Sequence, residues 1–95
     1  MNFEDITAGS RERPSLIEVI LYEGVFFNNQ ASSMSCAYGK DKKSEKQGIT
    51  LAGYVAHKDS NNIVMCPYLP QDTDVGSLGG WQIYKSAIHS IRELR

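Results

Sequence analysis

Four cysteine and histidine side chains in this 95-residue chain could ligate a soft metal, namely Cys36, His57, Cys66 and His89, and both types can also act as nucleophile or base. A zinc site built from such residues usually presents them as close pairs, for example Cys-x-x-Cys or His-x3-His. No two of the four stand at such a spacing. We therefore expect no metal site and no metal cofactor.

The segment Cys66-Pro67-Tyr68 resembles the first three residues of the glutaredoxin active site, whose Cys-Pro-Tyr-Cys motif holds a low-pKa thiolate at a helix N-terminus. The resemblance implies a redox role for Cys66. The fourth residue here is Leu69, however, and Pro70 follows it, so no helix begins there to stabilise a thiolate. We expect Cys36 and Cys66 to be free thiols inside strands.

Two polar loops have the composition of ligand-binding loops. Residues 72–76 carry oxygen ligands at alternate positions, as a calcium loop does, but the twelfth position, which needs a bidentate acid, is Ile83. The glycine-rich residues 76–80 match neither the Walker pattern nor Gly-x-Gly-x-x-Gly. Neither loop predicts a cofactor. Because no Gly-x-Ser-x-Gly elbow or comparable motif is present, we also expect that the protein is not an enzyme.

Candidate contact residues fall into an aromatic and a cationic group. Aromatic side chains on a strand face that points away from the core are typical of protein-contact surfaces. Cationic side chains gather between Gly39 and Gly48 and on the polar face of the C-terminal segment, although solvated loops and helix faces also have this composition. The candidate partner-binding residues are Tyr22, Phe26, Tyr54, Lys40, Lys42, Lys43, Lys46, Lys85, His89, Arg92 and Arg95.

Composition and charge narrow the class of protein. A formal net charge of -1 lacks the cationic field of a sequence-independent nucleic-acid binder. The longest apolar run, Val19-Ile20-Leu21-Tyr22, is too short to span a bilayer, and residues 2–6 carry acids where a secretory signal carries cations. These features, together with only two cysteines, favour a cytoplasmic protein without membrane contact.

The spacing of apolar residues predicts four strands and one helix. Residues 16–27, 32–38, 49–56 and 63–68 read as strands, and the first has apolar side chains on both faces, as a central strand does. Residues 79–95 repeat apolar side chains at three- and four-residue steps, which indicates an amphipathic helix. The predicted fold class is α+β, a small antiparallel four-stranded sheet (β-β-β-β-α) with the C-terminal helix packed on one face. Residues 1–15 are predicted to be a flexible N-terminal arm, and residues 16–95 a single domain.

One resemblance to a family extends over several segments. Three successive segments are similar in order to the strand, proline-containing turn and helix of HicB-type antitoxins. They are Tyr54-Val55-Ala56, then Pro67-Tyr68-Leu69-Pro70, then Thr73 and Gly76 before a helix that carries Ala87-Ile88. The likeness covers less than half of the chain, which lacks the acidic helix start of that family. It implies an antitoxin-like regulator.

Taken together, these features favour a non-enzymatic protein-binding module, a small inhibitor or accessory factor that acts on a larger protein or complex. The first alternative is a nucleic-acid-binding protein that uses the lysine-rich loop and the cationic C-terminal face. The second is the antitoxin-like regulator. An exposed sheet edge can also pair with its own copy, so the sequence is compatible with a homodimer.

Overall fold

The computed structural model describes residues 1–10, 12–25, 27–29, 34–37, 39, 45–68 and 80–94. Within these residues the regular elements are strands and short 3-10 turns. In chain order they are η1 (Phe3–Asp5), β1 (Leu16–Tyr22), β2 (Phe27–Asn29), β3 (Met34–Ala37), β4 (Gln47–Lys58), β5 (Asn62–Cys66), β6 (Gly80–Tyr84), η2 (Lys85–Ala87) and β7 (Ile88–Glu93).

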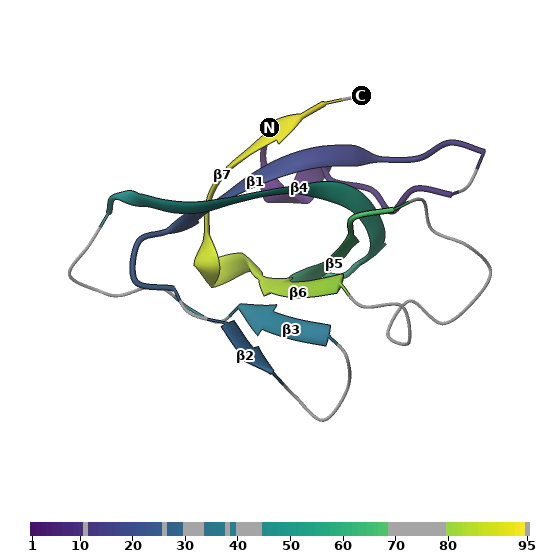
Figure 1. Ribbon diagram of the computed structural model, residues 1–95. Coiled ribbons are helices and arrows are strands. Elements are labelled where there is room, and N and C mark those ends of the chain that lie inside the picture. Colours follow the sequence, from purple (N-terminus) through teal and green to yellow (C-terminus); the bar gives the residue numbers. More distant parts are fainter. Residues whose placement is uncertain are drawn as a thin grey trace.

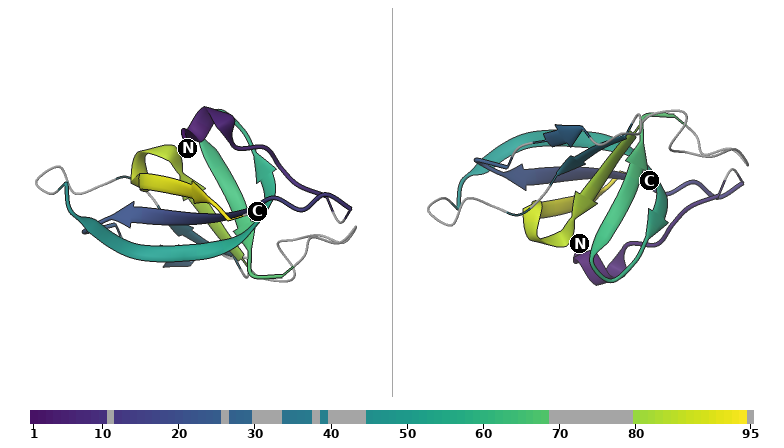
Figure 2. Two further views of the ribbon diagram at one scale, coloured as in Figure 1. Left: turned by 90° about the horizontal axis from the view of Figure 1, so that it is seen from above. Right: turned by 90° about the horizontal axis from the view of Figure 1, so that it is seen from below.

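The strands form one seven-stranded mixed sheet in the order β2-β3-β6-β5-β4-β1-β7. Neighbouring strands are antiparallel except β3 and β6, which run parallel. The sheet curls, so that β1 and β4 face β5 and β6 across the interior (Figure 1 and Figure 2). The predicted four-stranded antiparallel sheet is therefore wrong, because β6 comes from the segment expected to be helical and inserts between β3 and β5.

The curl depends on β4, whose 12 residues pair with two different strands. Its first part pairs with β1, from Gln47 opposite Tyr22 to Tyr54 opposite Leu16, and its last part pairs with β5. The pairing register with β5 shifts between Val55 and His57. Such irregularities bend a strand and increase its twist, so β4 passes from one side of the core to the other.

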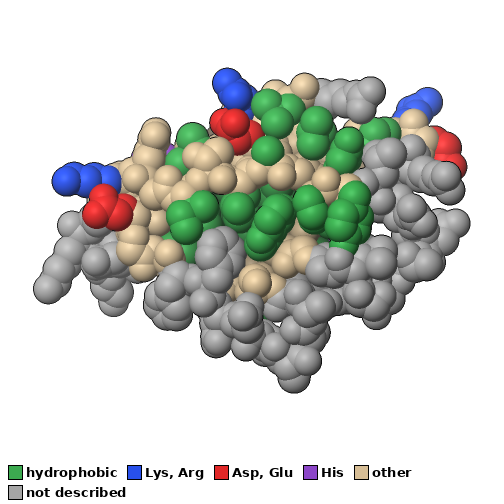
Figure 3. All heavy atoms as spheres, in the orientation of Figure 1, with side chains coloured by type: hydrophobic (Ala, Val, Ile, Leu, Met, Phe, Trp, Pro, Cys, Tyr) green, Lys and Arg blue, Asp and Glu red, His purple; other side chains and the backbone are tan. Residues whose placement is uncertain are grey.

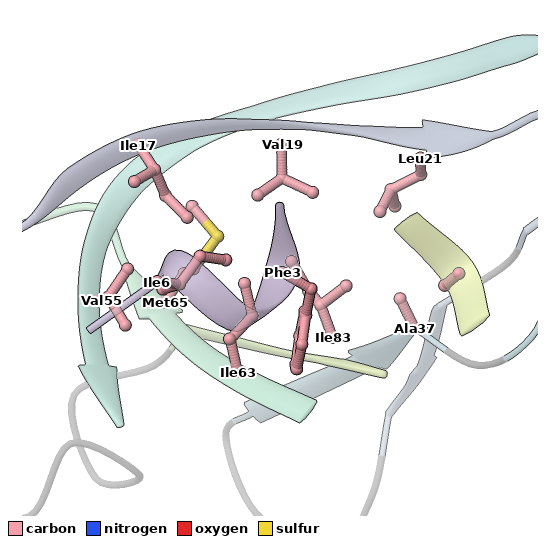
Figure 4. Close-up of a cluster of buried hydrophobic side chains, with 11 residues drawn as sticks. Phe3, Ile6, Ile17, Val19, Leu21, Ala37, Val55, Ile63, Met65 and Ile83 are labelled. Carbon is pink, nitrogen blue, oxygen red and sulfur yellow. The ribbon is translucent and has the colours of Figure 1, made fainter. Parts of the chain in front are cut away.

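The hydrophobic core lies inside this curl (Figure 4). Ile17, Val19 and Leu21 alternate along β1 and are fully buried, and Ile63 and Met65 of β5 meet them from the opposite side. The intervening side chains of β1 are half-buried. The prediction that this strand is central is confirmed, since β1 lies between β4 and β7.

The N-terminal residues contribute to the same core, although residues 1–15 were expected to form an arm. Phe3 is 7% exposed and Ile6 is 1% exposed, and both point into the interior from the region of η1 (Figure 4). Further along, the amide of Gly9 donates to the carbonyl oxygen of Val55 at 3.0 Å. The segment is thus hydrogen-bonded to β4.

The amphipathic helix predicted for residues 79–95 is wrong, because the described part of this segment forms β6, η2 and β7. Trp81 and Ile83 contact the core at the two-residue step of a strand, and after the 3-10 turn Ile88 and Ile91 contact it as well. Two strands separated by a short turn thus give nearly the same spacing of apolar residues along the sequence as an amphipathic helix does. Aromatic and β-branched side chains favour strands. Among the residues described, no helix has the length and apolar character needed to cross a membrane.

Candidate functional site

The structure describes six of the predicted contact residues and divides them between the two ends of β1. Tyr22 is the last residue of this strand and pairs with Gln47, which directly follows Lys46. The ring of His89 contacts the ring of Tyr22. Arg92 and Tyr54 lie opposite earlier residues of β1. The other predicted contact residues lie outside the described residues, namely Phe26, Lys40, Lys42, Lys43 and Arg95.

Tyr22 and Tyr54 do not form one aromatic patch. Tyr54 pairs with Leu16, at the start of β1, whereas Tyr22 is its last residue. Six residues of extended strand correspond to about 20 Å. The two half-buried rings therefore belong to separate parts of the surface.

An open hollow lies at the Tyr22 end of the sheet and has a volume of about 670 Å³. Strand β1 contributes one aromatic ring to it, and the junction of β6 with η2 contributes a second. The other described lining residues come from η2, the start of β7 and the β4–β5 turn. The described lining residues, which we call the β1–η2 hollow, are Tyr22, Asn61, Tyr84, Lys85, Ser86 and Ile88.

Hydrogen bonds in the β4–β5 turn position Asn61 and η2. The Asp59 carboxylate accepts from the backbone amides of Asn61 at 2.8 Å and Asn62 at 3.1 Å. These bonds, with the Asn61 amide as the main cause, lower the pKa of Asp59. The carbonyl oxygen of Asn61 accepts from the backbone amide of Lys85 at 2.7 Å. The turn is thus tied directly to the first residue of η2.

The rim of the hollow carries an ion pair with the N-terminal segment. Lys85 Nζ donates to Glu4 Oε1 at 2.6 Å, and this bond is the main cause that lowers the pKa of Glu4. The ammonium groups of Lys58 and Lys85 lie 5.1 Å and 5.5 Å from the centre of the Phe3 ring. Both distances allow cation–π attraction. Lys58 Nζ also donates to the carbonyl oxygen of Glu4 at 3.4 Å.

His89 lies beside the hollow rather than on the exposed face of a helix, where the sequence placed it. Its ring meets the ring of Tyr22 edge to face, with centroids 5.2 Å apart. Its Nδ1 lies 3.2 Å from Ser90 Oγ. The imidazole is half-buried in this position, so it supports the wall that Tyr22 forms.

Arg92 is separated from the hollow and paired with an acid. Its Nη2 donates to Glu18 Oε2 at 3.2 Å across the β1–β7 pair. In Figure 3 the lysine and arginine side chains likewise lie beside aspartate and glutamate side chains, and hydrophobic side chains form a band across the middle of this face. The face in view therefore shows no continuous cationic patch among its described residues.

The two cysteines are free and buried in strands, as predicted. Cys66 Sγ donates to the carbonyl oxygen of Tyr68 at 3.1 Å. Burial raises the pKa of the Cys66 thiol, which is opposite to the shift that a glutaredoxin-like nucleophile needs. In the described ranges, no group of three histidine, cysteine or acidic side chains could hold a metal ion.

Sequence reasoning missed most of the hollow. The helix predicted for residues 79–95 would put Tyr84 and Ile88 on its apolar face and Ser86 on its polar face, and Asn61 was not among the predicted contact residues. A helix packed on one face of the sheet would not bring these residues together at the end of β1. One local signal could have indicated the turn between β6 and β7. Lys85 and Ser86 are polar and stand between two apolar segments, as turn residues do.

Searches against protein-family models, curated proteins and solved structures find no match to this chain.

Proposed function

We propose that the protein is a non-enzymatic protein-binding module, a small inhibitor or accessory factor that acts on a larger protein or complex, and that the β1–η2 hollow is its contact surface. The observation that carries this proposal is the composition of the lining, in which two tyrosines and an isoleucine lie beside a lysine, a serine and an asparagine. Tyrosine is enriched in protein interfaces because one ring supplies both apolar area and a polar end.

The strands and the backbone hydrogen bond at the base of the hollow also suit recognition. Tyr22 and Tyr84 each end a strand, and η2 is attached to the β4–β5 turn by the Asn61–Lys85 backbone hydrogen bond. A surface that is ordered before binding loses less side-chain freedom when a partner docks. These features favour an interface over a solvated loop.

The polar groups near the hollow favour binding over catalysis. His89 contacts Ser90 within hydrogen-bond distance, but a nucleophilic pair also needs a third group that orients the base. The imidazole packs instead on Tyr22, and the Lys85 ammonium is paired with Glu4. Neither arrangement supplies a base that is oriented toward a nucleophile.

The proposal is tested by filling the hollow. Ser86 is exposed and lines it, so Ser86→Trp should obstruct the site without changing the core. Ser10→Trp makes the same change in the loop before β1, where Ser10 is also exposed. Circular dichroism and thermal unfolding would first establish that both variants are folded.

The wild-type protein and both variants would then serve as baits in affinity capture from the native host, followed by calorimetry with each purified candidate partner. A specific partner should bind the wild type and the Ser10→Trp variant, and bind Ser86→Trp at least about tenfold more weakly, which is a loss of about 1.4 kcal/mol. A partner that binds Ser86→Trp with unchanged affinity would contradict the assignment of the hollow.

Nucleic-acid binding, an antitoxin-like role and a homodimer stay predictions from the sequence. For the first of these, the described cations Lys85 and Arg92 each pair with a carboxylate, which reduces the positive charge they offer to phosphates. A salt titration of binding to single- and double-stranded DNA and RNA distinguishes the two functions, because binding through phosphates weakens steeply with salt.

We also propose that the protein acts in the cytoplasm. The support is chemical, since both cysteines are free thiols and unpaired cysteines are typical of a reducing compartment. Fractionation of the native host followed by immunodetection tests this placement.

A further inference from the structure

We infer that the β1–η2 hollow takes an acidic peptide segment with an apolar anchor residue, and that Glu4 of the same chain competes with this segment for Lys85. The inference rests on the proposed function of the hollow and specifies the chemistry of the partner.

The charge of the hollow favours an acid. Among its described lining residues the one charged side chain is Lys85. Ser86 and Asn61 can also donate hydrogen bonds to a carboxylate. Hydrogen bonds between an ammonium and a carboxylate are stronger than those between neutral groups. An acidic partner therefore gains electrostatic attraction from Lys85, and the hollow offers further hydrogen-bond donors.

The apolar part of the hollow is the site for the apolar anchor residue of the peptide. Tyr22, Tyr84 and Ile88 lie on three different elements around it. A side chain that enters among them removes apolar surface from water on both partners. Anchor residues that fill such pockets usually carry most of the binding energy in an interface.

Lys85 already binds a carboxylate within the chain, because its Nζ donates to Glu4 Oε1 at 2.6 Å. The side chains of Glu4 and Lys85 are 67% and 52% exposed. Exposed ion pairs are weak because water and salt screen them. A partner carboxylate can therefore replace Glu4 at little cost.

Burial of Phe3 keeps Glu4 close to Lys85 after such a replacement. Phe3 is anchored in the core directly before Glu4 and lies within reach of the Lys58 and Lys85 ammonium groups. A tethered group of this kind has a high effective concentration. Glu4 should therefore lower the affinity for an acidic partner by a modest factor.

The experiment uses a displayed library of random 12-residue peptides, selected on the full chain, with the enriched peptides then synthesised. Their dissociation constants would be measured by fluorescence polarisation for the wild type, Lys85→Met, Glu4→Gln and Ser86→Trp. Glu18→Gln and Arg92→Met are matched controls, since Glu18 and Arg92 form another ion pair between an acid and an exposed cation, and neither residue lines the hollow.

We expect enriched peptides to contain aspartate or glutamate near an apolar residue. Lys85→Met and a change of the peptide acid to its amide should each weaken binding about five- to tenfold. The two changes together should weaken binding little more than either change alone, because they remove the same interaction. Glu4→Gln should tighten binding about two- to fivefold. The control variants should stay within about twofold.

The outcomes separate the two proposals. Some peptides could bind the wild type but not Ser86→Trp, while Lys85→Met and replacement of their own acids by amides leave the dissociation constant unchanged. That outcome would overturn the acidic-segment inference and would still support the hollow as a binding site. Unchanged or weaker binding by Glu4→Gln would overturn the competition. No enriched peptide, or peptides that bind Ser86→Trp normally, would overturn the inference and the proposed function together.

Discussion

The rings of Tyr22 and His89 meet edge to face, with centroids 5.2 Å apart and planes inclined by 69°. The contact joins the last residue of β1 to the second residue of β7, beside the point where the register between these strands shifts. It therefore holds together the two strands that supply Tyr22 and Ile88 to the hollow at a place where regular pairing is interrupted.

A double-mutant cycle measures this contact. Tyr22→Ala and His89→Ala should each destabilise the protein, and their effects on the free energy of unfolding in urea should be non-additive by about 0.5 to 1.5 kcal/mol, as for other aromatic pairs. The cycle of Tyr54→Ala with His89→Ala is the control, because Tyr54 lies near the other end of β1. Additive effects for Tyr22 and His89 would show that the ring contact adds no stability.

Phe3→Ala tests how far the N-terminal segment belongs to the fold. Because Phe3 is buried in the core cluster, its truncation should lower the free energy of unfolding by about 3 kcal/mol. Met1→Ala, at an exposed position, should change it by less than about 0.5 kcal/mol. Equilibrium unfolding in urea gives both values, and equal small effects would show that residues before β1 behave as an arm in solution.

Gly53→Ala should destabilise the curled sheet. A Cβ at this position would lie 2.6 Å from the carbonyl oxygen of Cys66, a backbone atom that cannot rotate away. Forcing extra volume into such a contact usually costs about 1 to 3 kcal/mol. The melting temperature of the Gly53→Ala variant should fall by several degrees, whereas Ala52→Ser on the exposed neighbour should change it little. An unchanged melting temperature would mean that β4 and β5 separate more easily than the structure indicates.

Acidification should remove the contribution of the Glu4–Lys85 pair. The hydrogen bond from Lys85 lowers the pKa of Glu4 below its ordinary value of 4.5, so the folded state favours the carboxylate. A depressed folded pKa contributes stability that is complete above the unfolded value and is lost as the pH falls through the folded value. The stability difference between the wild type and Glu4→Gln should thus be constant near neutral pH and shrink below pH 4.5.

Urea unfolding of both proteins across this range measures the difference. In a Lys85→Met background the main cause of the shift is absent, and the pH dependence of the difference should be much smaller. A wild-type difference that persists unchanged into strong acid would contradict the pairing of Glu4 with Lys85 in solution.

Cys66 should be inert in the folded protein. Burial raises the pKa of its thiol, and the thiolate is the nucleophilic form. Iodoacetamide at neutral pH should therefore label Cys66 much more slowly in buffer than in urea, as followed by mass spectrometry of the digested protein. Rapid labelling of the native protein would instead support the redox role that the resemblance to glutaredoxin implies.

Local pattern was sufficient for the elements whose signal lies within a few neighbouring residues. The two apolar faces of residues 16–27 predicted a central strand, of which residues 16–22 form β1, and the predicted strands 49–56 and 63–68 overlap β4 and β5. Cys36 and Cys66 were placed correctly in strands. Alternation and turn chemistry are properties of adjacent residues, so the sequence by itself determined these features.

The tertiary structure decided the C-terminal segment and the candidate site. The apolar positions from Trp81 to Leu94 suit a helix as well as two strands joined by a 3-10 turn, and pairing with β5, β3 and β1 selected the strands. Such partners are distant in sequence and leave no local signal. The hollow likewise joins Tyr22, Asn61 and residues 84–88, which come together only because the sheet curls around its core.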